Sequence, residues 1–186
     1  MNFLLRLSRP IDGVTERVGR ATMWLVLATC LISAGNAVVR KAFDMSSNAF
    51  LEIQWYLFSA VFLLGAAYTL LRNEHIRIDL LVGRLSPRGQ AIVDIVGGLL
   101  FLLPMAIVIT LYVWPFFTRA LVSGEMSPDA GGLIRWPVWA LVPAGFGLLI
   151  LQACSEIIKR FAFLTGHAPY PGTPLGQHGQ TEQEHI

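Results

Sequence analysis

Charged side chains are scarce in this 186-residue chain: aspartate, glutamate, lysine and arginine make up 14% of it, and hydrophobic residues make up 54%. An ordinary soluble domain contains about 25% charged residues. Four long apolar runs interrupt the sequence, and each approaches the ~20 residues that cross a hydrocarbon layer about 30 Å thick. The composition therefore argues against a soluble domain and predicts an all-α integral membrane protein with four transmembrane helices.

Patterns typical of catalysis and of cofactor binding are also missing. The sequence has no glycine-rich phosphate loop, no His/Glu metal spacing within a helix, and no nucleophile with a base at the same expected depth. Cys30 and Cys154 fall inside apolar runs, which argues against a disulfide framework. Haem-binding anchors need histidines inside the spans, and all four here lie outside them: His75, His167, His178 and His185. We expect a chain that is not an enzyme and has no cofactor, metal site or nucleic-acid partner of its own.

The apolar runs predict transmembrane spans at about residues 21–39, 49–71, 92–113 and 137–157, within a membrane domain of residues 21–160. Residues 1–20 carry leucines beside arginines over too short a length to span, which predicts an interfacial N-terminal arm; a frayed tail is the alternative. Residues 161–186 are rich in Gly, Pro, Gln and His, and we expect a disordered cytoplasmic tail. Pro104 and Pro143 fall at membrane depth and predict kinks.

Basic residues are distributed unevenly between the two sides of the predicted membrane domain. If the N-terminus is cytoplasmic, ten of the fourteen basic residues lie on the inner side. The other four lie on the outer side: Arg40, Lys41, Arg119 and Arg135. This asymmetry follows the positive-inside rule and predicts that both termini are cytoplasmic.

The connector between the second and third spans has a helical pattern. Ile78, Leu81, Val82 and Leu85 follow the i, i+3, i+4, i+7 spacing of one helical stripe, which predicts an amphipathic cytoplasmic connector helix. Two arginines flank this stripe and could reach lipid phosphates. The helix could hold a partner protein, or it could only anchor the chain to phospholipids.

Three acidic residues, Glu52, Asp94 and Glu156, lie within about two turns of a span end. Charges at such positions cost less than charges at the bilayer centre, so we interpret these acids as interfacial contacts rather than a translocation path. For Glu52, pairing with Arg40 and pairing with a basic group on another subunit both remain open. The face of its helix that also carries Trp55, Ser59 and Phe62 is expected to meet another helix, within this chain or in a partner.

The outer connector between the third and fourth spans is rich in turn formers. It carries charges of both signs, so it could be a docking surface; a plain solvated turn is equally consistent with the composition. Its candidate docking residues are Arg119, Glu125, Asp129 and Arg135.

Several segments together resemble one known family. They are Glu52-x-Gln-Trp-Tyr, Gly65-Ala-Ala-Tyr-Thr, Glu74-His-Ile-Arg-Ile-Asp79, Gly124-Glu-Met-Ser127, Gly131-Gly132, Trp136, Pro143-x-Gly145 and Leu151-Gln152. In this order around four spans, over about residues 20–160, they resemble the small membrane subunit (DctQ-type) of tripartite ATP-independent periplasmic (TRAP) transporters. No single one of these segments is a catalytic signature.

The resemblance implies partners and a location for the chain. It implies a non-catalytic small permease subunit of the bacterial inner membrane, beside a separate large multi-span permease subunit that carries the sodium and substrate sites. It also implies a periplasmic substrate-binding protein that delivers organic acids. The candidate contacts with the partner or with membrane phospholipids are Glu52, Gln54, Trp55, Ser59, Arg77, Asp79 and Arg84. The alternative is an independent four-span module, either an oligomeric small transporter or the membrane anchor of an enzyme.

Overall fold

The computed structural model describes residues 2–43, 47–73 and 85–171. Six helical elements occupy most of these residues: α1 (Asn2–Phe43), α2 (Asn48–Leu71), α4 (Pro87–Gly97), η1 (Gly98–Leu102), α5 (Leu103–Ser123) and α6 (Trp136–Leu164). Within the described residues, the only β-type pairing is an isolated bridge between Met126 and Ile134. Four helical stretches are long and apolar enough to cross a membrane. The predicted all-α, four-span fold class is confirmed.

The first helix is longer than the sequence analysis expected. α1 runs through 42 residues without a break at residue 20, and Pro10 lies inside it. At 1.5 Å per residue its length is about 63 Å, roughly twice the hydrocarbon thickness of a bilayer. The predicted N-terminal arm and the first span therefore form one helix, which must tilt or extend beyond the hydrocarbon. Whether its N-terminal part lies in the membrane interface stays a prediction.

A row of small side chains explains how this first part of α1 packs. Ser8, Thr15 and Thr22 are all buried and lie seven residues apart, so they share one helical face. On the same face a Cβ atom at Gly19 would lie 2.3 Å from the ring of Tyr68 in α2. Small residues allow helices to approach closely in membranes. The residues that sequence analysis assigned to an arm thus form a packed helix face.

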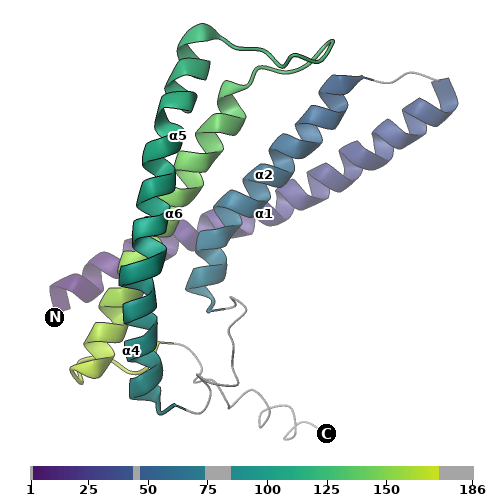
Figure 1. Ribbon diagram of the computed structural model, residues 1–186. Coiled ribbons are helices and arrows are strands. Elements are labelled where there is room, and N and C mark those ends of the chain that lie inside the picture. The colour runs from purple at the N-terminus through teal and green to yellow at the C-terminus, as the bar shows by residue number, and fades with distance from the viewer. Residues whose placement is uncertain (1, 44–46, 74–84, 172–186) are drawn as a thin grey trace, which may run out of the picture.

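The central helix of the protein is α6, which packs against α1, α2, α4 and α5 and contains eight of the buried residues. It crosses α2 at Gly145, where an added Cβ would lie 2.7 Å from the backbone oxygen of Leu63. Figure 1 shows α5 and α6 side by side, with α1 and α2 forming a second pair inclined to them. The loop after α5 extends toward the start of α2.

The third span is built from three consecutive elements, α4, η1 and α5, and is longer than the predicted residues 92–113. The span begins with a cap: the Ser86 hydroxyl accepts a hydrogen bond from the N–H of Gly89 (3.3 Å), and Pro87 occupies the first turn. The π-helical turn η1 ends two residues before Pro104. A proline lacks the N–H that an α-helix needs, and a local π turn is one way in which a membrane helix adjusts to it.

The predicted disordered tail and the predicted connector helix are only partly covered by the described residues. α6 continues to Leu164, so the tail does not begin at residue 161. Tyr170 then packs edge-on against Phe163 (ring centroids 5.1 Å apart) and donates a hydrogen bond to Gln90 Oε1 (3.3 Å). Disorder is therefore the wrong prediction for this first part of the tail. Residues 172–186, and the predicted connector helix except for Leu85, lie outside the described residues.

Candidate functional site

The loop between α5 and α6, residues 124–135, folds as a small hairpin. The N–H of Ser127 donates to the carbonyl of Leu133, and the N–H of Arg135 donates to the carbonyl of Glu125, both at 2.9 Å. These two bonds hold the arms of the loop together although neither arm is long enough for a strand. We call this segment the outer loop, since it follows the end of the third span that sequence analysis places outside.

Two glycines allow the outer loop its sharp changes of direction. Gly131 has a φ of 73°, in a turn closed by a 2.9 Å hydrogen bond from the N–H of Gly132 to the carbonyl of Asp129. Gly124 ends α5 with a φ of 61°. Left-handed backbone of this kind strongly favours glycine, so the turn formers of the sequence correspond to defined backbone positions.

Glu52 holds the outer loop against α2. Its side chain is buried, with 6% of the residue exposed. One carboxylate oxygen accepts a hydrogen bond from the N–H of Leu133 (2.7 Å), and the other accepts one from the Ser127 hydroxyl. Hydrogen bonds to a charged group are stronger than those between neutral groups. Sequence analysis proposed a cation as the partner of Glu52, either Arg40 or a residue of another subunit; the structure instead supplies two neutral donors from the loop.

Two further side chains of α2 bind the same loop. The Asn48 amide donates to the carbonyl of Ala130 (3.0 Å), and the Tyr56 hydroxyl donates to the carbonyl of Ile134 (3.1 Å). Together with Glu52 these residues are spaced four apart, so they form one stripe along the first turns of α2. The stripe fixes the outer loop at three points across the end of the bundle.

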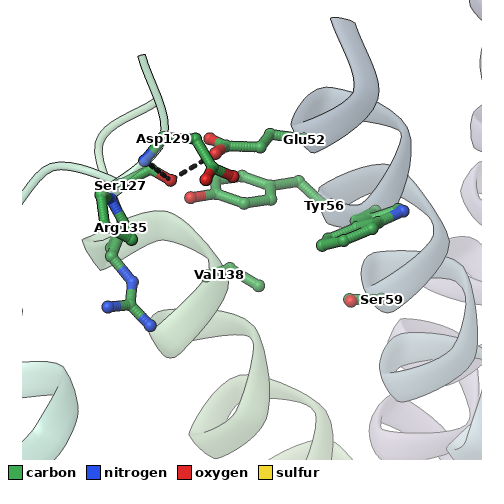
Figure 2. Close-up of a pocket in the computed structure, with 9 residues that line it drawn as sticks. Glu52, Tyr56, Ser59, Ser127, Asp129, Arg135 and Val138 are labelled. Carbon is green, nitrogen blue, oxygen red and sulfur yellow. Dashed lines mark hydrogen bonds between the residues drawn. The ribbon is translucent and has the colours of Figure 1, made fainter. Parts of the chain in front are cut away.

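A pocket of about 350 Å³ lies beneath the outer loop, between α2 and α6. Figure 2 shows Glu52, Tyr56 and Ser59 on the α2 side and Arg135 and Val138 on the α6 side. Trp55 and Asp129 also line the pocket. Gln54 does not: its amide donates to the carbonyl of Phe50, one turn earlier in the same helix (2.8 Å).

The charged residues of the outer connector do not form one cluster. Arg135 pairs with Glu125 at 2.6 Å, and its guanidinium lies 6.0 Å from the ring centroid of Trp139. Trp139 in turn stacks on Phe116 of α5, with ring centroids 5.4 Å apart. Arg119 is exposed on α5 and does not line the pocket. The four candidate docking residues are therefore divided between an ion pair, the pocket wall and the exposed face of α5.

At the opposite end of the bundle, Arg160 of α6 is the centre of a buried charge cluster. Only 2% of this residue is exposed. Its Nε donates to Asp94 of α4 (2.7 Å), its Nη1 donates to Glu156, and its Nη2 donates to Asn73 Oδ1 after α2 (3.3 Å). One guanidinium thus joins α6 to α4 and to the end of α2. The guanidinium of arginine is planar and carries five N–H donors, so it can contact several acceptors at once.

A neighbouring group of polar side chains joins α6 to α1. Asp12 accepts hydrogen bonds from the Gln152 amide (2.9 Å) and the Ser155 hydroxyl (2.8 Å), and it pairs with Lys159 (3.1 Å). Lys159 also pairs with Glu156, which connects this group to the Arg160 cluster. We refer to both groups together as the inner charge cluster.

Beside the inner charge cluster, Glu16 of α1 pairs with Arg72 at the end of α2 (2.5 Å) and with Arg20 (2.9 Å). The Arg72 Nε also donates to the Tyr68 hydroxyl (3.1 Å). The Tyr68 hydroxyl first, and then the Glu16 carboxylate, raise the pKa of Arg72 above its usual value. Both contacts therefore favour the charged form of Arg72.

Comparison with known proteins identifies this arrangement of helices. Residues 29–163 match the family of tripartite ATP-independent periplasmic transporters, DctQ component. The chain belongs to the DctQ family. A protein of Haemophilus influenzae (strain Rd), which carries the provisional name TRAP transporter small permease protein, is 34% identical over 68 residues. This match covers 37% of the chain and 42% of the relative, and no solved structure matches.

Members of the DctQ family are components of transporters, and the family is not a catalytic one. The four long apolar helices indicate that this DctQ chain is a multi-pass membrane protein. Nowhere in residues 2–43, 47–73 and 85–171 do three His, Cys, Asp or Glu side chains gather as metal ligands would. The charges that sequence analysis placed at span ends are largely paired with one another in the DctQ fold. They connect helices to each other and to the outer loop.

The sequence predicted two acids of the inner charge cluster near span ends but not the residues that they pair with. Asp94 and Glu156 were predicted near span ends, whereas Asp12 lay in the predicted interfacial arm and Gln152 was named only within a segment that resembles the family. The seven-residue spacing of small polar residues around Asp12 was the available signal. The candidate contacts Arg77, Asp79 and Arg84 lie outside the described residues.

Proposed function

We propose that this DctQ chain is the non-catalytic small permease subunit that scaffolds a separate large multi-span subunit in the bacterial inner membrane. The large subunit would carry the sodium and substrate sites, and the pair would take up organic acids delivered by a periplasmic substrate-binding protein. In this proposal both termini are cytoplasmic and the outer loop faces the periplasm. Membership of the DctQ family supports the assignment to a TRAP transporter.

An exposed aromatic ridge on α2 carries the scaffold proposal. Trp55, Phe58 and Phe62 are 71%, 66% and 72% exposed, and their i, i+3, i+7 spacing places them on one helical face. No helix of the described chain covers them. Aromatic residues are enriched at protein interfaces and among the residues that dominate binding energy. We therefore assign this aromatic ridge to the contact with the large subunit.

Side-chain contacts at both ends of the helix bundle are consistent with a scaffold role. A subunit that supports a moving neighbour gains from helices that keep their relative positions. The Glu52 contact fixes the outer loop on α2, and Arg160 ties α6 to α4 and to the end of α2. Buried, hydrogen-bonded polar networks of this kind rigidify and specify a single packing.

The outer loop supports the proposed docking of the binding protein. Its backbone is fixed by Asn48, Glu52 and Tyr56, while Met126 and Asp129 are exposed on its surface. A preorganised surface loses less conformational entropy on binding than a flexible one. The connector residues Arg77, Asp79 and Arg84 complete the proposal as contacts with phospholipid headgroups or with the large subunit.

Removal of the aromatic ridge tests the scaffold role. We expect the double variant Trp55→Ala/Phe62→Ala to retain at least about 25-fold less of the large subunit during affinity purification from native membranes, since each of the two lost anchors costs about 1 kcal/mol or more. The measurement is the amount of large subunit per tagged small chain, quantified by mass spectrometry. The thermal unfolding transition of the purified small chain should be unchanged.

The matched control is Phe101→Ala, because Phe101 in η1 is equally exposed (73%) but lies in the third span rather than on the ridge. It should retain the large subunit as the wild type does. Wild-type retention in the ridge variant would show that the ridge faces lipid, and an equal loss in the control would show that the effect is not specific to the ridge.

A further inference from the structure

A second pocket lies between α1 and α2, at the end of the bundle where α1 finishes and α2 begins. Its volume is about 530 Å³, larger than that of the pocket under the outer loop. On the α1 side it is lined by residues that repeat at i, i+3, i+7 and thus share one face. The side chains that matter for its chemistry are Ser33, Asn36, Arg40 and Lys41 of α1 and Leu51 and Gln54 of α2.

The pocket carries positive charge. Arg40 and Lys41 are both exposed, and neither forms an ion pair with an acid in the described residues. Glu52 lies in the same part of α2, but its carboxylate is bound to Ser127 and Leu133 on the outer loop. Asp44 belongs to the link between the helices and lies outside the described residues. Two adjacent cations without an acid in the lining attract an anion.

The start of α2 adds to this positive field. The first turn of a helix leaves N–H groups without intrahelical partners and carries a partial positive charge. In α2 the N-cap residue Ser47 makes no side-chain cap, and the first turn has no acidic residue. Leu51 and Gln54, in the first two turns, line the pocket. Any anion held there would therefore lie close to an uncapped helix start.

Hydrogen-bond donors extend from the cations toward the interior of the span. Asn36 and Ser33 precede Arg40 by four and seven residues, about 6 and 10 Å along the helix axis. Within the described residues neither the Asn36 amide nor the Ser33 hydroxyl has a hydrogen-bond partner. A polar donor in hydrocarbon without a partner is costly. A small anion could bind to the two cations alone. The donors Asn36 and Ser33 lie deeper in the span, so a ligand that satisfies them must carry further acceptor oxygens at that depth.

We propose that this pocket binds one phospholipid of the adjacent leaflet. The phosphodiester lies between Arg40 and Lys41, and the glycerol ester carbonyls accept hydrogen bonds from Asn36 and Ser33. A phospholipid offers this combination, because its phosphate and ester oxygens lie at successive depths above an apolar tail that can follow Leu51. The proposal does not depend on a large subunit, since all contacts come from this chain.

Lipid retention by the full chain tests the proposal. The purified chain is delipidated in detergent and incubated with phosphatidylglycerol, with diacylglycerol, or with phosphatidylglycerol plus a large excess of inorganic phosphate, and bound lipid is counted by native mass spectrometry. We expect one tightly held phosphatidylglycerol per chain, little retained diacylglycerol, and little displacement by phosphate. Because each basic residue contributes about fivefold to headgroup binding, Arg40→Gln/Lys41→Gln should weaken retention by about 25-fold. Asn36→Ala should weaken it by about fivefold, the contribution of one hydrogen bond.

Two further variants make the outcome decisive. Arg119→Gln removes an exposed basic residue that lines neither pocket, and this variant should retain lipid as the wild type does. Arg40→Lys keeps the positive charge and should therefore keep most of the lipid retention of the wild type. Unchanged retention in Arg40→Gln/Lys41→Gln, or the same loss in Arg119→Gln, would overturn the proposal. Displacement by inorganic phosphate at concentrations near those of the lipid would also overturn it, because it would assign the pocket to small anions.

Discussion

Replacing Arg160 with alanine should lower the free energy of unfolding by about 3–5 kcal/mol, the cost of removing one partner from a buried ion pair. The variant leaves the carboxylates of Asp94 and Glu156 without their shared cation, and it also removes the contact to Asn73 after α2. At about 2–4 °C per kcal/mol for a chain of this size, the thermal transition in detergent should fall by roughly 10 °C.

The control for this substitution is Arg20→Ala. Arg20 also makes an ion pair, with Glu16 of the same helix, but its side chain is mostly exposed. Exposed pairs contribute about 0–1 kcal/mol, so its transition should barely move. Adding Asp94→Asn to the Arg160 variant should recover part of the loss, because it removes a buried carboxylate that has lost its ion pair with Arg160. Equal thermal transition temperatures for the Arg160 and Arg20 variants would contradict the stabilising role of the Arg160 contacts.

Substitution of Gly145 should separate α2 from α6. A Cβ at this position would lie 2.7 Å from the backbone oxygen of Leu63, and a backbone atom does not move aside as the end of a flexible side chain can. Overpacking of this kind costs about 1–3 kcal/mol. We therefore expect Gly145→Ala to lower the thermal transition by several degrees, and Gly145→Leu to do so more strongly.

Gly147 provides a matched comparison on the same helix. A Cβ at Gly147 would meet nothing within 4 Å, and alanine is favoured over glycine in a helix by about 1 kcal/mol. Gly147→Ala should therefore leave the transition unchanged or raise it slightly. If Gly145→Ala behaved as Gly147→Ala does, the close crossing of α2 and α6 at Leu63 would be refuted.

The sequence predicted the helices well because long apolar runs have few alternatives in a membrane. A lipid environment requires backbone hydrogen bonds to be satisfied within each segment, so length and composition nearly determine the fold class. The continuity of α1 was missed, because Pro10 and the mixed leucines and arginines of its first turns suggested a separate arm. Side chains of α2 and α6 stabilise this part of the helix, and those contacts are remote in sequence.

Pairing across the chain was the information that sequence patterns could not supply. Glu52 was recognised as an unusual acid at a span end, but its partners lie about eighty residues later in the outer loop. One of them is a backbone N–H, which every residue except proline offers and which no motif therefore indicates. Asp12 and Lys159 are further apart still. Periodicity shows which residues share a face, and only the packed structure shows which faces meet.

Uptake into liposomes tests the central claim, that this DctQ chain is a scaffold within a transporter and not a transporter by itself. Liposomes containing the purified chain alone should accumulate no organic acid under a sodium gradient. Liposomes containing the chain together with the large subunit, and supplied with the substrate-binding protein, should accumulate it in a sodium-dependent manner. Sodium-driven uptake by the small chain alone would contradict the account.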